Sequence, residues 1–421
     1  MSHRPLWRQP PVLGWALYDW ANSAFALSVM TTFVPVLMAG YWNDGAPSSV
    51  GTFRLGMANG VSSLLVALLT PFIGALADRS GRRKAWLLWV TALGCALTAA
   101  LYFLAAGRWL AAAMLYVGAS GAFAVGNSLY DSLLVDVAAP DDYDRVSAWG
   151  YGLGYLGSAL LFTLNVAMVA RPAAFGLASA DEAVRLAFLL VALWWLVFSL
   201  PVAWWVHDDP VREGGPGALV AGFRQLAATL RKLWGEVALR RFLLAYWLYI
   251  DAVYTIIKMA VDYGLALGLP QQALIQAILL TNFVAFPAAL GFGWIAGVIG
   301  TRAGIYLGLA VYLAATAAAG FLHTEGQFYA LAAVIGMVQG GVQSLSRSFF
   351  ARLIPAAQTG EYFGFYNMLG KFAAIIGPVL VGVVALLSGS QRLGIISLLL
   401  LFIAGLVLLA RVPGGRRAAG G

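Results

Sequence analysis

Long apolar runs separated by short polar segments dominate this chain. Twelve of these runs are long enough to cross the roughly 30 Å of hydrocarbon in a bilayer as helices. The first six lie at Gly14–Gly40, Phe53–Leu76, Ala85–Ala106, Trp109–Ala138, Val146–Ala170 and Val184–Val206. The other six follow a polar stretch and lie at Phe242–Leu267, Ala273–Val298, Ala303–Leu322, Phe328–Phe350, Tyr362–Leu387 and Leu393–Ala410. The pattern predicts an all-α polytopic membrane protein with twelve transmembrane helices in two sets of six.

Composition agrees with this prediction. Of the 421 residues, 61% are hydrophobic and only 10% are charged, whereas a soluble globular protein has about a quarter of its residues charged. The first apolar run is too long for a signal-peptide core and has no small-residue cleavage site, so we expect it to be retained. The formal charge of +8 is spread over short loops. A basic face for nucleic acid is therefore not expected.

Basic residues are unequally distributed between the two sides of the predicted helices. One side carries Arg4, Arg8, the segment Arg79–Lys84, Arg145, the segment Arg212–Arg241, Arg302, Arg352, Arg411, Arg416 and Arg417. The other side carries Arg54, Arg108, Arg171, Arg185 and Arg392. By the positive-inside rule both termini are cytoplasmic. The predicted organisation is a cytoplasmic tail (1–13), a six-helix bundle (14–206), a cytoplasmic linker (207–241), a second bundle (242–410) and a cytoplasmic tail (411–421).

The linker contains an amphipathic pattern. Its apolar residues recur at helical spacing opposite Arg224, Arg231 and Lys232, and they are Phe223, Leu226, Leu230, Leu233, Trp234 and Val237. This arrangement predicts a helix that lies on the inner leaflet, attracted by anionic lipid. A helix that binds a protein partner is the alternative.

A charged loop, GALADRSGRRK at Gly74–Lys84, joins the second and third runs, and GWIAGVIGTR at Gly293–Arg302 takes the same place in the second half. A second internal repeat relates the segment that starts at Asp131 to the segment that starts at Arg347. Each has a charged helix end, then a proline-containing loop, then a Gly-rich helix. Two related bundles that face one another are the architecture of alternating access.

These motifs carry a family resemblance. The loop resembles the loop signature of the major facilitator superfamily. Four further segments together are similar to the vacuole-effluxer-like (autophagy-related vacuolar amino-acid permease) family of that superfamily: WALYDWANSAF from Trp15, the segment 131–157, LYIDAVYTII from Leu248, and GGVQSLSRSFFARLIP running on to GKFAAIIGP. Fungal members release amino acids from the vacuole. The resemblance implies a major facilitator fold of two pseudo-symmetric six-helix bundles, and a secondary transporter that exports an amino acid or related metabolite.

The resemblance also implies a conformational latch in the charged loop. Asp78 is expected to hold the loop against the facing half, with Arg82 as its partner inside the loop. The residues of this predicted latch are Gly74, Asp78, Arg79, Gly81, Arg82 and Arg83.

Two charged residues lie nearest the middle of their predicted helices, Asp251 and Lys371. An ionisable group at the bilayer centre costs about 2.5 to 3.5 kcal/mol on insertion scales, so each one is a candidate for function. The resemblance implies that the seventh and eleventh helices line the cavity. Asp251 then binds a proton and Lys371 holds an anionic group of the substrate. A fixed structural ion pair between the two is the alternative.

Other polar side chains inside the helices are candidates for contact with substrate or proton. Gln339, Gln343 and Arg347 recur every four residues on the tenth helix and form one polar stripe. The remaining candidates are Asp19 and Asn22 on the first helix, Asn127 on the fourth and Asn367 on the eleventh. Asparagines in membrane helices also serve as hydrogen-bonding glue between helices.

Opposite charges near the cytoplasmic ends of corresponding helices predict a gate. Asp131 and Asp136 stand on the fourth helix, and Arg347 and Arg352 stand at the equivalent places in the second half. Ion pairs between the two sets would close the cytoplasmic side of the cavity. Side chains that simply extend to the membrane interface are the alternative.

Several classes of chemistry are not indicated. The sequence has no phosphate-binding loop of the Walker kind, no His/Cys/carboxylate cluster with metal-ligand spacing and no nucleophile elbow. We therefore expect no enzymatic activity, no cofactor and no metal.

The expected partners are a small-molecule substrate, protons and the lipid bilayer, and we expect a monomer in a bacterial cytoplasmic (inner) membrane. An uptake system or a drug exporter is the alternative transporter, and a non-transporting receptor or assembly factor is the remote one.

Overall fold

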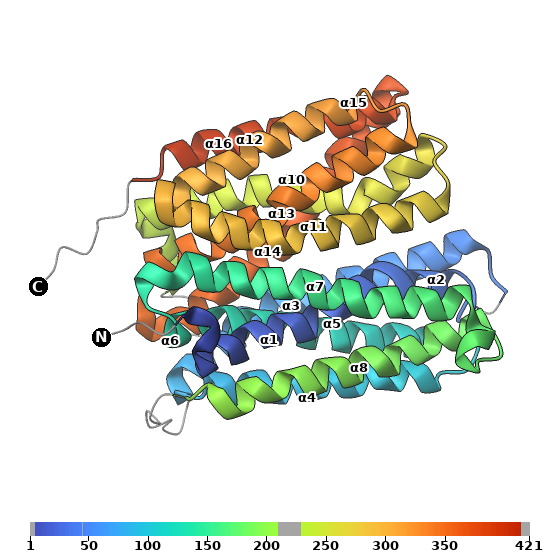
Figure 1. Ribbon diagram of the computed structural model, residues 1–421, viewed down its shortest axis with the longest axis horizontal. Coiled ribbons are helices and arrows are strands. Elements are labelled where there is room, and N and C mark those ends of the chain that lie inside the picture. The colour runs from blue at the N-terminus through green and yellow to red at the C-terminus, as the bar shows by residue number, and fades with distance from the viewer. Residues whose placement is uncertain (1–4, 44, 209–228, 414–421) are drawn as a thin grey trace, which may run out of the picture.

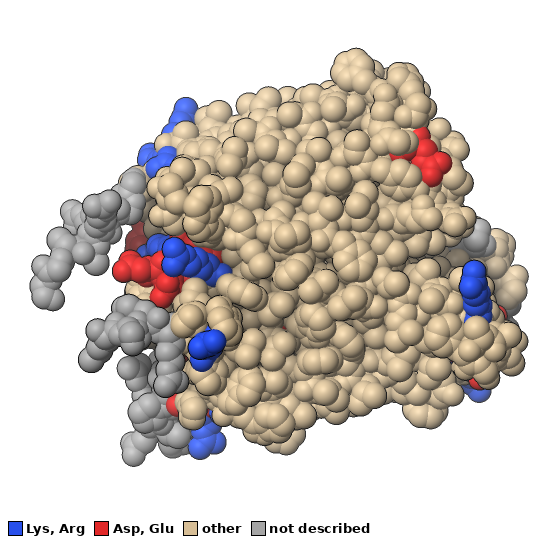
Figure 2. All heavy atoms as spheres, viewed as in Figure 1, with Lys and Arg blue, Asp and Glu red and all other residues tan. Residues whose placement is uncertain are grey.

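The computed structural model describes residues 5–43, 45–208 and 229–413, and these residues form long helices that run side by side (Figure 1). Within them, twelve helical segments are long and apolar enough to cross a membrane, which confirms the predicted number. On the face that Figure 2 shows, the charged side chains lie at the two ends of the molecule, with an uncharged belt between them. Such a belt suits contact with hydrocarbon.

The N-terminal half provides the first six spans. Its α- and π-helices are α1 (Pro10–Ala24), the π-helical η2 (Phe25–Phe33), α2 (Val34–Ala39), α3 (Ser48–Ser80), α4 (Arg83–Ala100), α5 (Trp109–Ser132), α6 (Leu134–Val137), α7 (Tyr143–Ala170) and α8 (Ala180–Trp205). Short 3-10 turns lie at Leu6–Arg8, Leu101–Phe103, Pro140–Asp142 and Pro172–Phe175. The first helix begins at Pro10 and not at Gly14, because proline is well tolerated in the first turn. Asp19 consequently lies past the middle of α1.

The C-terminal half provides the other six spans. Its helices are α10 (Val237–Ala266), α11 (Gln271–Ile299), α12 (Thr301–Ala319), α13 (Glu325–Leu353), α14 (Thr359–Ser388), α15 (Gln391–Ile396) and α16 (Leu399–Ala410), with a 3-10 turn at Ala356–Gln358. In Figure 1 the two halves lie one above the other, with α1–α8 below and α10–α16 above.

The first span passes through a π-helical stretch just before a proline. Pro35 has no backbone N–H, and its ring crowds the preceding turn. The hydroxyls of Thr31 and Thr32 donate to the carbonyl oxygens of Ala26 and Leu27, at 2.9 Å in both cases. The wider turn thus keeps its carbonyl groups paired while the span continues past the proline.

The predicted amphipathic helix of the linker falls partly on residues 209–228, which lie outside the described residues. Residues 229–235 are helical. Leu233 is buried against the protein, whereas Leu230 and Trp234 are exposed. A helix that lies on a membrane surface exposes apolar side chains in this way. Contact with lipid stays a prediction.

The halves meet along α7 packed on α11 and α13, and along α14 packed on α3 and α5. Gly74 on α3 and Gly293 on α11, the first glycines of the two repeated motifs, lie at this interface. A methyl group on Gly74 would collide with the carbonyl oxygen of Gly360, and a Cβ on Gly293 would lie 2.6 Å from Cβ of Ala148. Both glycines thus permit close contact with the opposite half. The end of the molecule that carries the Gly74–Lys84 loop is called the loop end below.

Candidate functional site

A buried arginine of the C-terminal half lies inside the N-terminal half. Arg347 on α13 is 1% exposed, and its Nη1 donates to Oδ1 of Asp131 on α5 at 2.9 Å. The same nitrogen lies 3.7 Å from Oδ2 of Asp19 on α1. Nε and Nη2 of Arg347 donate to Oγ and the carbonyl oxygen of Ser147 on α7, at 2.9 Å in both cases. One guanidinium therefore lies between two carboxylates and connects α13 with helices of the opposite half.

Aromatic rings enclose this guanidinium. Its Cζ lies 4.7 Å from the ring centroid of Trp15, 5.2 Å from that of Tyr130 and 4.3 Å from that of Tyr151. Trp15 stacks on Tyr130 with ring centroids 4.4 Å apart, and its Nε1 donates to the Tyr130 carbonyl at 2.8 Å. A desolvated cation over a ring gains about 2 kcal/mol. We call the group that surrounds Arg347 the arginine cage: Trp15, Asp19, Tyr130, Asp131, Ser147 and Tyr151.

Glycines on α7 make room for the cage. A Cβ on Gly150 would lie 2.5 Å from the Tyr130 hydroxyl and 3.0 Å from Nη2 of Arg347. A Cβ on Gly154 would lie 2.7 Å from Oδ1 of Asp19. The Gly-rich helix that the sequence repeat indicated is therefore the wall against which α1 and the guanidinium pack.

Two predicted substrate contacts cross the interface beside the cage. Nδ2 of Asn367 on α14 donates to Oδ2 of Asp131 at 2.8 Å. The hydroxyl of Tyr155 on α7 donates to Oε1 of Gln343 on α13 at 3.0 Å. Both carboxylate oxygens of Asp131 thus receive hydrogen bonds from the C-terminal half.

The remaining predicted polar contacts are Asp19, Asn22, Asn127 and Gln339. Asp19 accepts from the hydroxyls of Ser23 at 2.9 Å and Tyr130 at 3.1 Å. Asn22 and Asn127 are hydrogen-bonded to each other. Gln339 is buried on α13. Asp19, Gln343 and Asn367 therefore take part in contacts between the halves, whereas Asn22 and Asn127 are paired within the N-terminal half. The roles of all five in binding stay predictions.

The predicted gate residues form only part of the ion pairs expected between Asp131 and Asp136 on one side and Arg347 and Arg352 on the other. Asp131 is paired with Arg347, as described, but Asp136 does not pair with Arg352. Nη1 and Nη2 of Arg352 contact Oδ1 and Oδ2 of Asp144, at 2.9 and 3.0 Å. The reason is the end of α5 at Ser132: Asp136 stands on the separate short helix α6, whereas Asp144 in the first turn of α7 faces α13.

Asp144, which the sequence pattern alone does not distinguish, makes several contacts at the loop end. It is 5% exposed and accepts from Thr301 Oγ1 at 2.7 Å, and from the hydroxyl of Ser348. The available signal was its place in the repeated segment, where it follows Asp141 and Asp142. Because those two neighbours precede the helix, the sequence alone did not distinguish the buried carboxylate from exposed ones.

The predicted latch is present as a contact, with a different partner. Asp78 accepts from the backbone N–H of Gly360 at 3.0 Å and of Glu361 at 2.8 Å, at the start of α14. Its side-chain partner is Arg83 and not Arg82, because Arg83 is the buried first residue of α4 and Arg82 before it is exposed. Gly81 sets this register by ending α3 with a φ of 62°. A carboxylate at a helix N-terminus is favourable.

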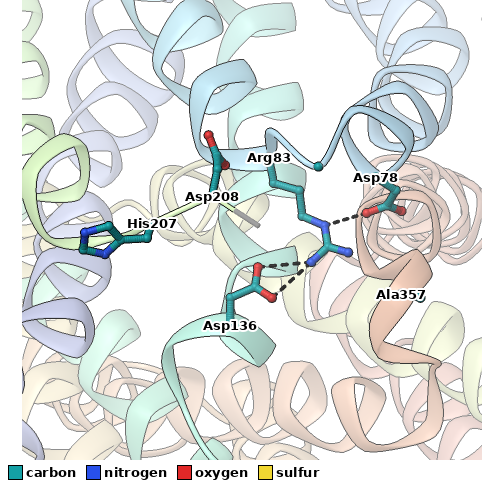
Figure 3. Close-up of a pocket in the computed structure, with 7 residues that line it drawn as sticks. Asp78, Arg83, Asp136, His207, Asp208 and Ala357 are labelled. Carbon is teal, nitrogen blue, oxygen red and sulfur yellow. Dashed lines mark hydrogen bonds and ion pairs between the residues drawn. The ribbon is translucent and has the colours of Figure 1, made fainter. Parts of the chain in front are cut away.

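Arg83 connects three segments at the loop end (Figure 3). Its Nε donates to Asp78 at 2.6 Å, its Nη1 contacts Asp136 at 3.1 Å, and its Nη2 donates to the carbonyl oxygen of Ala356 at 3.1 Å. A small cavity of about 40 Å³ adjoins this arginine, and it is lined by Asp78, Gly81, Arg83, Asp136, His207, Asp208 and Ala357. The arginine therefore ties α3, α6 and the turn before α14 together.

The first residues of the linker are fixed to α4. The carboxylate of Asp208 accepts from the backbone N–H groups of Lys84 at 2.7 Å and Ala85 at 3.2 Å. In return, Nζ of Lys84 donates to the carbonyl oxygen of Val206 at 2.9 Å, just after α8 ends. Both contacts place a charge where the helix dipole favours it. The linker thus starts beside the latch.

Asp251 caps a weakened part of α14. Its carboxylate accepts from the N–H groups of Ile376 at 3.1 Å and Gly377 at 2.9 Å, and from Thr255 Oγ1 at 3.2 Å. Pro378 follows directly and disturbs the helical hydrogen bonds around it. The carboxylate is thus held by backbone groups of the neighbouring helix, and its proposed proton binding stays a prediction.

Lys371 points toward the other half. Its Nζ lies 5.8 Å from the ring centroid of Phe123 on α5. No ion pair joins Lys371 to Asp251 within residues 5–43, 45–208 and 229–413, where Asp251 has the backbone partners described above. The alternative of a fixed Asp251–Lys371 pair is therefore not what the structure shows.

Comparisons of the sequence with family models and with known proteins point to the same family. The model of the family described as "Vacuole effluxer Atg22 like" matches residues 45–142 and 135–419. A Bacillus subtilis protein, "Uncharacterized MFS-type transporter YxiO", is 36% identical over 401 residues, which cover 95% of this chain and 94% of that protein. Autophagy-related protein 22-1 of Penicillium rubens is 28% identical over 304 residues, 65% of this chain and 50% of the fungal protein. The match thus spans half of the fungal relative.

Solved structures show the same fold. The human organic anion transporter MFSD10 (TETRAN) superposes with a TM-score of 0.71 at 18% identity, covering 96% of this chain and 100% of that one. The proton:xylose symporter XylE also gives a TM-score of 0.71, at 12% identity and with 96% and 94% coverage. At these identities the likeness concerns the fold, and it confirms the predicted major facilitator architecture.

Proposed function

We propose that this chain, which belongs to the vacuole effluxer Atg22-like family, exports a small polar solute such as an amino acid by proton-coupled alternating access. The relatives and structural neighbours are membrane transporters of the major facilitator superfamily, not enzymes. The amino-acid class and the direction of transport follow from the resemblance to fungal permeases.

The observation that carries the proposal is the arginine cage. Arg347 of one half is buried between Asp19 and Asp131 of the other half. Movement of the halves at the loop end pulls this guanidinium away from its partners. Breaking a buried ion pair by removing one partner costs about 3 to 5 kcal/mol. The loop end therefore opens only when something else neutralises the two carboxylates.

Protons are the simplest replacement for Arg347. A proton on Asp131 or Asp19 removes the charge that the departing arginine leaves uncompensated. Binding of protons and opening of the loop end then favour each other, which is the linkage that coupled transport requires. We assign Asp131 and Asp19 as the proton sites, with Asp251 as a further candidate on α10.

The cargo is proposed to bind in the polar region between the halves. Lys371 is the candidate for an anionic group of the solute, since no ion pair of its side chain is seen in the described part of the chain. The uncharged donors and acceptors proposed to complete the site are Asn22, Asn127, Gln339, Gln343 and Asn367.

We further propose that the loop end faces the cytoplasm of a bacterial cell, with both termini on that side of the inner membrane. The excess of basic residues on the loops and tails at this end supports the orientation. Gate residues Asp131, Asp136, Arg347 and Arg352, together with Asp144, then close the cytoplasmic side. The halves 14–206 and 242–410 act as the moving bodies of a monomer.

Proteoliposomes loaded with labelled amino acids test the proposal. We expect an imposed proton gradient to accelerate efflux by the wild type, and Asp131→Asn and Asp19→Asn to transport without responding to the gradient. Asp181→Asn, an exposed carboxylate at the start of α8, is the control and keeps the response. Wild-type flux that is indifferent to the gradient for every amino acid tested would remove the coupling claim.

A further inference from the structure

Every group that contacts the Arg347 guanidinium in the arginine cage belongs to the N-terminal half. Trp15 and Asp19 stand on α1, Tyr130 and Asp131 on α5, and Ser147 and Tyr151 on α7. Only Arg347 comes from the C-terminal half. When the halves separate at the loop end, the cage stays behind as a complete pocket with nothing in it.

We propose that this pocket binds the guanidinium or amidinium group of a solute, and that Arg347 is the internal competitor of that solute. The inference rests on the alternating access proposed above. Cargo enters the cage only after Arg347 has left, and the arginine displaces the cargo when the loop end closes again.

The donor pattern selects a flat, forked cation. Nη1 of Arg347 donates to Asp131, whereas Nε and Nη2 donate to the hydroxyl and the carbonyl of Ser147. Acceptors at two edges of the guanidinium plane fit the fixed fork of N–H donors, which lies in that plane. The compact ammonium group has no such plane. The rings of Trp15 and Tyr151, at 4.7 and 4.3 Å from Cζ, give such a plane its stacking surfaces.

Charge favours an occupant of the empty cage. With Arg347 in place, the two carboxylates of Asp19 and Asp131 share one guanidinium, and Asp19 is the more distant at 3.7 Å. Without it, two acidic groups face one another in a pocket walled by aromatic rings. A cation restores the lost interactions, and protons are the competing way to neutralise the pocket.

Thermal unfolding of Arg347→Ala with small cations tests the pocket directly. We expect methylguanidinium, as the acetate salt, to raise the unfolding midpoint of Arg347→Ala in a saturable manner at millimolar concentration. Methylammonium should need about tenfold more for the same shift, equivalent to roughly 1.4 kcal/mol. Wild type should show no saturable shift, because its own arginine fills the cage. Arg352→Ala is the matched control. Arg352 also pairs with a carboxylate of the opposite half, Asp144, but it is an exposed residue and lies over the ring of Tyr143 instead of inside the arginine cage.

A second measurement on a protein that retains Arg347 covers the case in which Arg347→Ala does not fold. Ser344→Cys in a Cys95→Ser background places a thiol at a position that is fully buried on α13, where the Ser344 carbonyl accepts from Ser147 of the other half. Methylguanidinium should accelerate alkylation of this thiol at least about tenfold over potassium at equal ionic strength.

The proposal is overturned if Arg347→Ala responds to methylguanidinium no more than wild type does, or if methylammonium is equally effective. It is also overturned if the Ser344→Cys thiol reacts at the same rate with methylguanidinium and with potassium. These measurements do not depend on flux. Saturable binding together with absent amino-acid efflux would contradict the proposed cargo while leaving the pocket in place.

Discussion

Asp131 and Arg347 occupy corresponding positions in the two sequence repeats, and they are paired with each other at 2.9 Å across the interface between the halves. Each repeat places a charged residue at the same point of its fourth helix, but the charges are opposite. The pseudo-symmetry that relates the halves therefore brings complementary groups together where the loop end closes. Both side chains are buried, at 5% and 1% exposure.

Replacing Asp131 by Asn should open the loop end. Arg347 then keeps the carbonyl and hydroxyl of Ser147 but loses its nearest carboxylate, and loss of a buried partner costs about 3 to 5 kcal/mol. We expect faster alkylation of Ser344→Cys in this variant. Asn367→Ala removes one hydrogen bond to the same carboxylate, about 1.5 to 3 kcal/mol, and should have a smaller effect.

A thiol in the core of one half controls for general unfolding in that experiment. Ser199→Cys on α8 is buried and bonded within its own helix. If Asp131→Asn exposes this thiol as much as the one at position 344, the variant has lost its fold, and the contact does not act as a gate.

Arg83→Ala should slow transport without changing the apparent affinity for cargo. The arginine holds Asp78, Asp136 and the Ala356 carbonyl at the loop end and lies in the latch, away from the cage. We expect the maximal rate to fall about tenfold, which corresponds to roughly 1.4 kcal/mol in the rate-limiting step. Initial rates of labelled-solute flux at several concentrations measure both quantities.

Arg82→Ala is the matched control for the latch, because Arg82 is the adjacent residue of the same loop and is exposed. Its flux should remain within about twofold of wild type, since most surface substitutions change stability by less than about 0.5 kcal/mol. Equal losses in Arg82→Ala and Arg83→Ala would show that the charge of the loop matters rather than the contact with Asp78.

The apolar pattern was sufficient to predict the helices, because membrane spans follow directly from length and hydropathy. The partners of individual charges did not follow. Arg82 and Arg83 are neighbours, and only the left-handed Gly81 at the end of α3 decides which of them starts α4 and turns inward. The depth of a residue along a helix likewise does not reveal the direction in which its side chain points. From its depth Asp251 is expected to line a cavity, and in the structure its carboxylate accepts from backbone N–H groups of α14.

Asp251→Asn should destabilise the protein. Asn offers one acceptor oxygen where the carboxylate offers two, so either Ile376 or Gly377 loses its acceptor from this side chain. An unsatisfied buried amide costs about 1 to 3 kcal/mol, which should appear as a lower unfolding midpoint. If Asp251 also carries the coupled proton, residual flux in this variant no longer responds to a pH gradient. If it only caps α14, the response persists.

Glycines of α14 provide an independent check of that cap. Gly377→Ala should be strongly destabilising, because a Cβ there would collide with Oγ1 of Thr255 and lie 2.7 Å from Oδ1 of Asp251. Gly382→Ala, on the same helix with nothing within 4 Å, should be neutral or slightly stabilising. Similar midpoints for the two variants would mean that Asp251 and its hydrogen-bond partner Thr255 do not pack tightly against α14.

Gly74→Ala should weaken closure of the loop end, because the added methyl group meets the carbonyl oxygen of Gly360 on the opposite half. Backbone cannot move aside as a flexible side chain does, so the two halves must separate locally. Gly60→Ala on the same helix has nothing within 4 Å and should gain up to about 1 kcal/mol in helix propensity. Gly293→Ala should resemble Gly74→Ala, since its Cβ would lie 2.6 Å from that of Ala148. Thiol accessibility at position 344 measures closure in all three. An unchanged rate in Gly74→Ala and Gly293→Ala would show that the two repeated motifs do not seal this end.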